Sequence, residues 1–211
     1  MDGFMAKTDE GTNSTLTTAQ AWKRFVSGDN AAFKYVFKHY YTSLYGYGVK
    51  LSGNPELVKD CLQEIFRDLW ERRDELGHIE TPKVYLFVSL RRNILKKIKQ
   101  DRLSDRDLEE IDDQLPIQFG KEELIIEDEV KIQQRKQLRD ALNQLPDRQK
   151  EIVFLHFYNG MSYGEIEEIL SINRQSVRNH MYRAMETLRT LLNTEIMKLV
   201  VSFLLALLHF T

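Results

Sequence analysis

Residues 161–185 read MSYGEIEEILSINRQSVRNHMYRAM, and this stretch decides the fold. Apolar residues at three- and four-residue spacing predict a short helix over 163–170 and a second helix after a tight turn at 171–173. Ser162 is a suitable N-cap for the first helix, and Glu165 three residues later completes a capping box. Three residues of the second helix face inward: Val177, Met181 and Ala184. The stretch therefore predicts a helix-turn-helix.

The outer face of the second helix is polar, with three arginines and no acid between Asn173 and Met185. An α-helix fits the DNA major groove, where arginine can bond guanine and glutamine or asparagine can bond adenine. We expect the residues nearest the bases to be Arg174, Gln175, Ser176 and Arg178. We expect phosphate contacts from Asn179, Arg183 and His180. The alternative is a helical hairpin with a solvated polar face, which the absence of acids disfavours.

The composition indicates a helical protein without metal or disulfide chemistry. The 211 residues are 42% hydrophobic and 29% charged, with only 4 prolines and 10 glycines. Helical periodicity dominates, so the predicted class is all-α. The single cysteine, Cys61, excludes an internal disulfide framework and fits a reducing cytoplasm. The five histidines have no partner at zinc-ligand spacing, so we assign no metal and no cofactor.

Charge is distributed unevenly along a chain whose net charge is only −2. Residues 83–100 hold six bases and no acid, whereas residues 101–129 hold twelve acids and three bases. This pattern predicts two small helical domains joined by an acidic linker. The expected divisions are a flexible leader at 1–18, a first domain at 19–100, the linker at 101–130, a second domain at 131–193 and an apolar tail at 194–211.

Within the first domain, periodicity predicts three helices. The first covers 29–51, with inward residues Phe33, Val36, Phe37, Tyr40, Tyr41 and Leu44. The second carries an apolar stripe of Val58, Leu62, Ile65, Phe66, Leu69 and Trp70. The third begins at Thr81-Pro82, a hydroxyl N-cap followed by proline at the first helical position. It is expected to expose Arg92, Asn93, Lys96 and Lys97.

Both domains resemble parts of a known family. Residues 141–154 (ALNQLPDRQKEIVF), 158–166 (YNGMSYGEI) and 176–184 (SVRNHMYRA) are similar to region 4 of extracytoplasmic-function sigma factors, a branch of the sigma-70 family. Residues 60–70 (DCLQEIFRDLW) and the pair Arg92-Asn93 resemble region 2 of the same family. The resemblance covers about residues 20–100 and 130–192.

The resemblance implies an RNA polymerase sigma factor that catalyses no reaction itself. It implies that Asp60, Gln63 and Glu64 bind the β′ clamp of core RNA polymerase, and that region 4 lies on the β flap. It implies that a basic helix holds the melted −10 element through Arg91, Arg92, Asn93, Lys96 and Lys97, while the helix-turn-helix binds the −35 element. An anti-sigma partner is implied too, with a cytoplasmic location or retention at the inner membrane through that partner.

Several alternatives remain open from the sequence. One alternative is a stand-alone helix-turn-helix regulator, which would explain residues 161–185 but not the first domain. Another is a nucleic-acid enzyme, but the sequence contains no catalytic motif that would support it. The acidic linker is either a phosphate mimic inside polymerase or a solvated spacer. Residues 196–210 are almost wholly apolar but too short for a membrane span. They would either cover the core of the second domain or form a docking or autoinhibitory segment.

Overall fold

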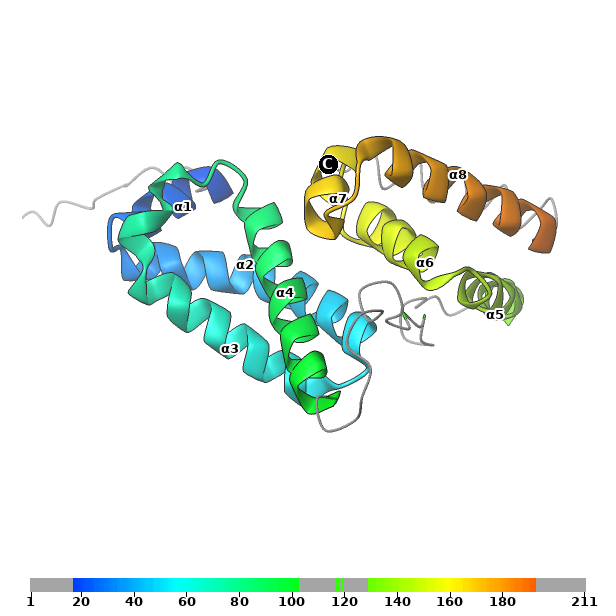
Figure 1. Cartoon of the computed structure of the whole chain (residues 1–211), viewed down its shortest axis with the longest axis horizontal. Coiled ribbons are helices and arrows are strands. Elements are labelled where there is room, and N and C mark those ends of the chain that lie inside the picture. The colour runs from blue at the N-terminus through cyan, green and yellow to red at the C-terminus, as the bar shows by residue number, and fades with distance from the viewer. Residues whose placement is uncertain (1–16, 103–116, 118, 120–128, 193–211) are drawn as a thin grey trace, which may run out of the picture.

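A computed structural model describes residues 17–102, 117, 119 and 129–192. All regular elements among these residues are helices, which confirms the predicted all-α class. The helices form two modules that lie side by side, one built from α1 to α4 and one from α5 to α8 (Figure 1). The expected leader, most of the linker and the apolar tail fall outside the described residues.

The N-terminal module contains α1 (Thr18–Val26), α2 (Asn30–Ser52), α3 (Pro55–Glu71), the short 3₁₀ helix η1 (Arg73–His78) and α4 (Pro82–Arg102). Polar caps fix where the helices begin. The Asp29 carboxylate accepts the amides of Ala31 and Ala32, and these bonds together with Arg24 lower its pKa. Asn54 caps α3 in the same way, and Pro55 takes the first helical position.

Sequence reasoning missed α1, although its N-terminus carries a readable signal. The Thr17 hydroxyl accepts the Gln20 amide, and the Gln20 side chain accepts the Thr17 amide, which is a complete capping box. Ala21, Trp22 and Phe25 of this helix are buried against the rest of the module. The helix begins at Thr18, directly after its Thr17 cap.

Helices α2, α3 and α4 meet closely around Gly48 on α2. A β-carbon at this position would lie 2.7 Å from Val58 Cγ1 and 3.2 Å from Ile94 Cδ1. Only glycine fits such a crossing without moving a neighbour. The crossing sets the position of α4, which carries the basic stretch predicted to bind DNA.

The C-terminal module contains α5 (Glu129–Asn143), α6 (Asp147–Val153), a π-helical turn η3 (Phe154–Tyr158), α7 (Tyr163–Leu170) and α8 (Arg174–Leu191). Asn159-Gly160 ends the π-helical turn, with Gly160 in the left-handed region at φ +59°. The capping box predicted between Ser162 and Glu165 is present at the start of α7. The helix-turn-helix is therefore confirmed, with Asn173 capping its second helix.

Two apolar residues from the acidic stretch are buried, which the charge pattern did not predict. Ile117 is fully buried, and Phe119 packs its ring against Phe154 and Tyr158. The Phe119 backbone exchanges two hydrogen bonds with the side chain of Asn143, at 2.8 and 3.2 Å. The chain is therefore anchored on the C-terminal module some ten residues before α5 begins.

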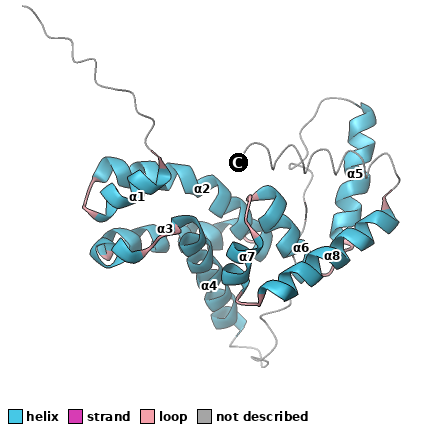
Figure 2. Cartoon of the chain, turned by 90° about the horizontal axis from the view of Figure 1, so that it is seen from above, coloured by secondary structure: helices cyan, strands magenta, loops and turns pink. Residues whose placement is uncertain are grey.

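The two modules are in direct contact. Helix α4 packs against α7, and both views place the C-terminal module alongside α4 (Figures 1 and 2). No helix within the described part of the chain is long and apolar enough to span a bilayer.

Candidate nucleic-acid and polymerase interfaces

The outer face of α8 presents the side chains predicted to approach DNA bases. Arg174, Gln175 and Arg178 are exposed, and Ser176 is half-buried with its amide bound to the Asn173 cap at 2.8 Å. Gln175 donates to the Asn179 side chain at 3.0 Å, which pre-orders two adjacent polar groups. Three inward residues, Val177, Met181 and Ala184, hold this face outward and are buried as predicted.

One turn further along α8 the character of the face changes. Arg183 is exposed as predicted, and beside it Tyr182 is 65% exposed. The Tyr182 hydroxyl donates to Glu186 at 2.8 Å, and this bond raises the tyrosine pKa. Glu186 is the first acid of the helix, so the positive face covers the first half of α8. The exposed aromatic residue was not among the predicted contacts.

Helix α4 carries the second predicted DNA face. Arg92 and Lys96 are exposed and Asn93 is half-buried, so these three lie where nucleic acid can reach them. Lys97 is also accessible, but its ammonium group pairs with Glu64 of α3 at 2.8 Å. This bond raises the Lys97 pKa, and it joins a predicted DNA-binding residue to a predicted polymerase-binding residue.

Arg91 differs from the other basic residues of α4, because it is only 6% exposed. Its guanidinium bonds Glu151 of the C-terminal module at 3.1 Å. Arg91 follows Phe87 by four residues and precedes Ile94 by three, so it lies on the inward stripe of the helix. The expectation that Arg91 faces DNA does not hold in this conformation, and the apolar spacing around it was the signal for its burial.

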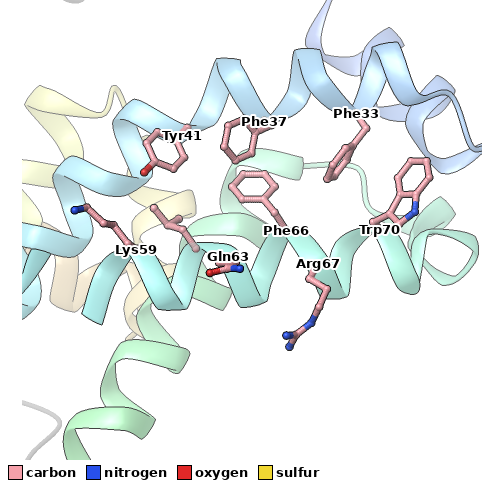
Figure 3. Close-up of a pocket in the computed structure, with 9 residues that line it drawn as sticks. Phe33, Phe37, Tyr41, Lys59, Gln63, Phe66, Arg67 and Trp70 are labelled. Carbon is pink, nitrogen blue, oxygen red and sulfur yellow. The ribbon is translucent and has the colours of Figure 1, made fainter. Parts of the chain in front are cut away.

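Helix α3 carries the predicted polymerase-binding residues on one face. Asp60 and Gln63 are exposed and Glu64 is half-exposed, at the spacing of one helical turn. Beside them runs a groove of about 450 Å³ between α2 and α3 (Figure 3). Gln63 lies on the rim of this groove, so the polar face and the groove form one continuous surface.

The groove has an aromatic lining that sequence analysis assigned to the core. Five rings, from Phe33, Phe37, Tyr41, Phe66 and Trp70, line the space between the two helices (Figure 3). Phe37 is 38% exposed, so its predicted inward position is wrong. Periodicity could not separate groove from core, because a ring at the edge of a two-helix contact has the same spacing as a ring inside it.

Comparisons with known proteins agree with this arrangement. Residues 36–103 match the family model for Sigma-70 region 2, and residues 135–188 match the model for Sigma-70, region 4. An ECF RNA polymerase sigma factor, SigK of Mycobacterium tuberculosis, is 20% identical over 178 residues, which cover 81% of this chain and 91% of that protein. The RNA polymerase sigma factor SigV of Bacillus subtilis is 28% identical over 145 residues, covering 67% and 80%.

Two solved structures share the fold. The sigma factor RpoE of Bartonella quintana, in complex with the anti-sigma factor NepR, aligns over 75% of this chain and 95% of its own, with a TM-score of 0.52 and 20% identity. CnrH in complex with the cytosolic domain of CnrY aligns over 81% and 94%, with a TM-score of 0.53 and 17% identity.

Proposed function

The chain belongs to the sigma-70 family as an extracytoplasmic-function RNA polymerase sigma factor, and we propose that its two modules bind the two promoter elements while core polymerase holds them. The N-terminal module would contact the −10 element, and the C-terminal module the −35 element. The observation that carries this proposal is the pairing of two positive helical faces, on α4 and on α8, within one chain. We assign the chain no reaction of its own.

Recognition of the −35 element is assigned to the first half of α8. Arg174, Gln175 and Arg178 are exposed at the start of a helix whose opposite side is buried, so they can enter a major groove together. Ser176 completes this set. A bidentate contact between a side chain and a base contributes about 1–3 kcal/mol of discrimination. Asn179 and Arg183 lie further along the exposed face and are assigned to phosphates.

Binding of the melted −10 element is assigned to the exposed side of α4. Single strands bind to positive grooves that follow the phosphate backbone, supplemented by polar groups that reach the bases. Arg92, Lys96 and Lys97 supply the positive charge, and Asn93 lies among them. Arg91 joins this set only if it is released from Glu151, its partner in the present conformation.

The exposed face of α3 is assigned to the β′ clamp of core polymerase through Asp60, Gln63 and Glu64. A polar row beside an aromatic groove suits a helix-to-helix contact, because the rings supply buried area and the polar groups fix orientation. An anti-sigma protein is a second proposed partner, as in the complexes of the two solved relatives. We place the chain in the cytoplasm, where an inner-membrane anti-sigma partner can retain it.

The test is transcription in vitro from a promoter library, using core polymerase and variants of α8. Arg178→Ala should lose about 5- to 150-fold in preference for the −35 sequence, which corresponds to the contact energy above. Arg189→Ala is the matched control, because Arg189 is an exposed arginine on the same helix but beyond the positive face. Equal −35 preference in the two variants would remove the base contact from Arg178.

The −10 assignment has its own test on the same templates. Lys96→Ala and Asn93→Ala should slow promoter opening, read as permanganate reactivity of unpaired thymines, while −35 preference stays unchanged. Normal opening by both variants would remove the −10 role of this α4 face. Templates opened in advance by a mismatched bubble should not restore full activity to either variant, because both side chains are assigned to the melted strand. Their unchanged −35 preference distinguishes this loss from a folding defect.

A further inference from the structure

Helix α2 carries a charge pattern that the proposed function does not use. Residues 30–55 hold three lysines and one histidine but no acid. Exposed helix surfaces ordinarily mix both signs, because opposite charges one turn apart stabilise each other. The neighbouring helix α3 follows this rule, with five acids and two bases. The exposed side of α2 therefore differs in charge from the helix beside it.

Four side chains on two adjacent turns define this surface, which we call the α2 face. Lys34, Tyr35, Lys38 and His39 are all exposed. Lys34 and Lys38 are neighbours at the spacing of one turn, and so are Tyr35 and His39. The rings of Tyr35 and His39 lie parallel, with their planes 8° apart and their centroids 5.9 Å apart. Two positive charges therefore lie beside a stacked pair of rings.

The two lysines of the α2 face have no ion pair among the residues that the structure describes. On α3 and in the turn after it, every basic residue has a nearby acid: Lys59 with Glu56, Arg67 with Asp68, Arg72 with Glu75, and Arg73 with Asp74. Arg92 and Lys96, on the exposed side of α4, also lack an ion pair within the described ranges. In this respect the α2 face resembles the surface assigned to −10 DNA and differs from α3.

The α2 face lies on the opposite side of α2 from the aromatic groove. Phe33 and Phe37 of α2 point into that groove, toward α3 (Figure 3). Each residue of an α-helix turns by about 100°, so Tyr35 and His39 lie about 200° around the axis from the two phenylalanines. A polymerase subunit that binds the groove would therefore leave the α2 face open to a second partner.

The chemistry of the α2 face favours a single-stranded nucleic acid over a protein. The centre of a protein interface is depleted of charged residues and rich in apolar ones. Outside the groove, Tyr35 is the one large apolar side chain that α2 exposes, and two lysines lie beside it. Single strands instead bind where positive charge follows the phosphates and aromatic rings stack on the bases. A base inside a duplex cannot reach such a ring.

We propose that the α2 face is a further nucleic-acid surface, which holds single-stranded DNA next to the −10 element in the opened promoter. Lys34 and Lys38 contact phosphates, and one base stacks on the Tyr35 ring, which His39 supports from its other side. The inference rests on the proposed function, because that function supplies the opened strand. Stacking accepts every base, so the contact should add affinity with little sequence preference.

The salt dependence of binding tests the two lysines. The probe is a mixed-sequence single-stranded oligonucleotide, titrated with the full-length chain assembled with core polymerase. Lys34→Gln with Lys38→Gln should reduce the slope of log affinity against log salt by about 1.4, because each phosphate contact on a single strand contributes about 0.7. The control pair Lys136→Gln with Arg189→Gln removes the same charge from exposed positions of the C-terminal module, and its slope should match that of the parent. A parental slope in the α2 pair would overturn the phosphate contacts.

The aromatic part of the α2 face is tested in the same titration. Tyr35→Ala should weaken binding about 5- to 150-fold and leave the salt slope unchanged, because stacking releases no counterions. Tyr35→Phe keeps the ring and should bind like the parent. Unchanged affinity in Tyr35→Ala, or an equal loss in Tyr35→Phe, would overturn the stacking role.

Photocrosslinking in the complete holoenzyme identifies the partner directly. The photoreactive amino acid p-benzoylphenylalanine replaces Tyr35, and the two strands of an opened promoter are labelled separately. We expect a crosslink to single-stranded DNA outside the −10 element, and the label shows which strand it is. Crosslinks only to polymerase subunits would make the α2 face a protein interface and overturn the proposal.

Lys96→Ala on α4 separates failure of this inference from failure of the proposed function. If Lys96→Ala weakens single-strand binding while the α2 variants do not, the α2 face is overturned and the −10 assignment stands. If the α2 variants weaken binding while Lys96→Ala does not, the α2 face stands and the −10 assignment loses its support. If the chain does not assemble with core polymerase, the proposed function fails, and the same titration on the free chain still decides whether the α2 face binds a single strand.

Discussion

Adding a single methyl group at Gly48 should loosen the crossing that positions α4. In Gly48→Ala the new β-carbon would lie 2.7 Å from Val58 Cγ1 and 3.1 Å from Val58 Cγ2. Overpacking of this kind costs about 1–3 kcal/mol, since Val58 is fully buried and its β-branched side chain has a restricted χ1 angle. The overpacking is partly offset, because replacing glycine by alanine inside a helix stabilises the folded protein by about 0.5–1 kcal/mol.

The same helix provides a matched control. Gly46 lies two residues earlier on α2, and a β-carbon there would meet nothing within 4 Å. Gly46→Ala should therefore gain the full helix preference of about 0.5–1 kcal/mol. The helix term is common to both variants, so the difference between them isolates the overpacking at about 1–3 kcal/mol.

Thermal and urea unfolding of the two full-length variants measure this difference. For a chain of this size, 1 kcal/mol corresponds to about 2–4 °C in Tm. The double variant Gly48→Ala with Val58→Ala should be less destabilised than the two single changes added together, because removing the Val58 methyl groups relieves the clash. Equal stability of Gly48→Ala and Gly46→Ala would refute the reasoning about the crossing.

Three further perturbations probe other parts of the chain. Ser162→Ala removes the cap of α7 and should destabilise the C-terminal module by about 1 kcal/mol, measured by urea unfolding; no loss would mean that the capping box is not formed in solution. Phe119→Ala empties a buried site and should cost about 3 kcal/mol, so a change below 0.5 kcal/mol, a value typical of exposed positions, would contradict the anchoring of the acidic stretch. Burial and the nearby Glu151 charge raise the Tyr47 pKa well above 10, so its stabilising contribution should be complete below pH 10 and lost as pH rises further. Tyr47→Phe should flatten this alkaline decline in the urea midpoint, and an unchanged decline would mean that another group causes it. Arg91 and Arg148, the other charged groups at the site, act in the opposite direction and lower the Tyr47 pKa.

Local signals predicted the helices well, because caps and turns act over a few residues. The capping box of Ser162 and Glu165 predicted the start of α7, and Thr81-Pro82 predicted the start of α4. Helix α1 was missed even though its capping box is local and Ala21, Trp22 and Phe25 form an apolar stripe, because only nine residues give a short periodic pattern. The buried Phe119 was hidden by the acids around it in sequence.

The contact between the modules could not be predicted in this way. Tyr47 and Glu151 are 104 residues apart, and Arg91 and Glu151 are 60 apart. Periodicity reports which face of a helix is buried but not which partner covers it. Arg91 therefore looked like one more member of a basic row, although its place on the inward stripe already indicated burial.

The central claim is that this chain gives core RNA polymerase a promoter specificity that neither has alone. Run-off transcription from a promoter library, with core polymerase alone, the chain alone and the two together, measures it directly. We predict defined start sites only in the mixture, with shared sequences near −35 and −10 upstream of them. Start sites that are the same with and without the chain would contradict this account.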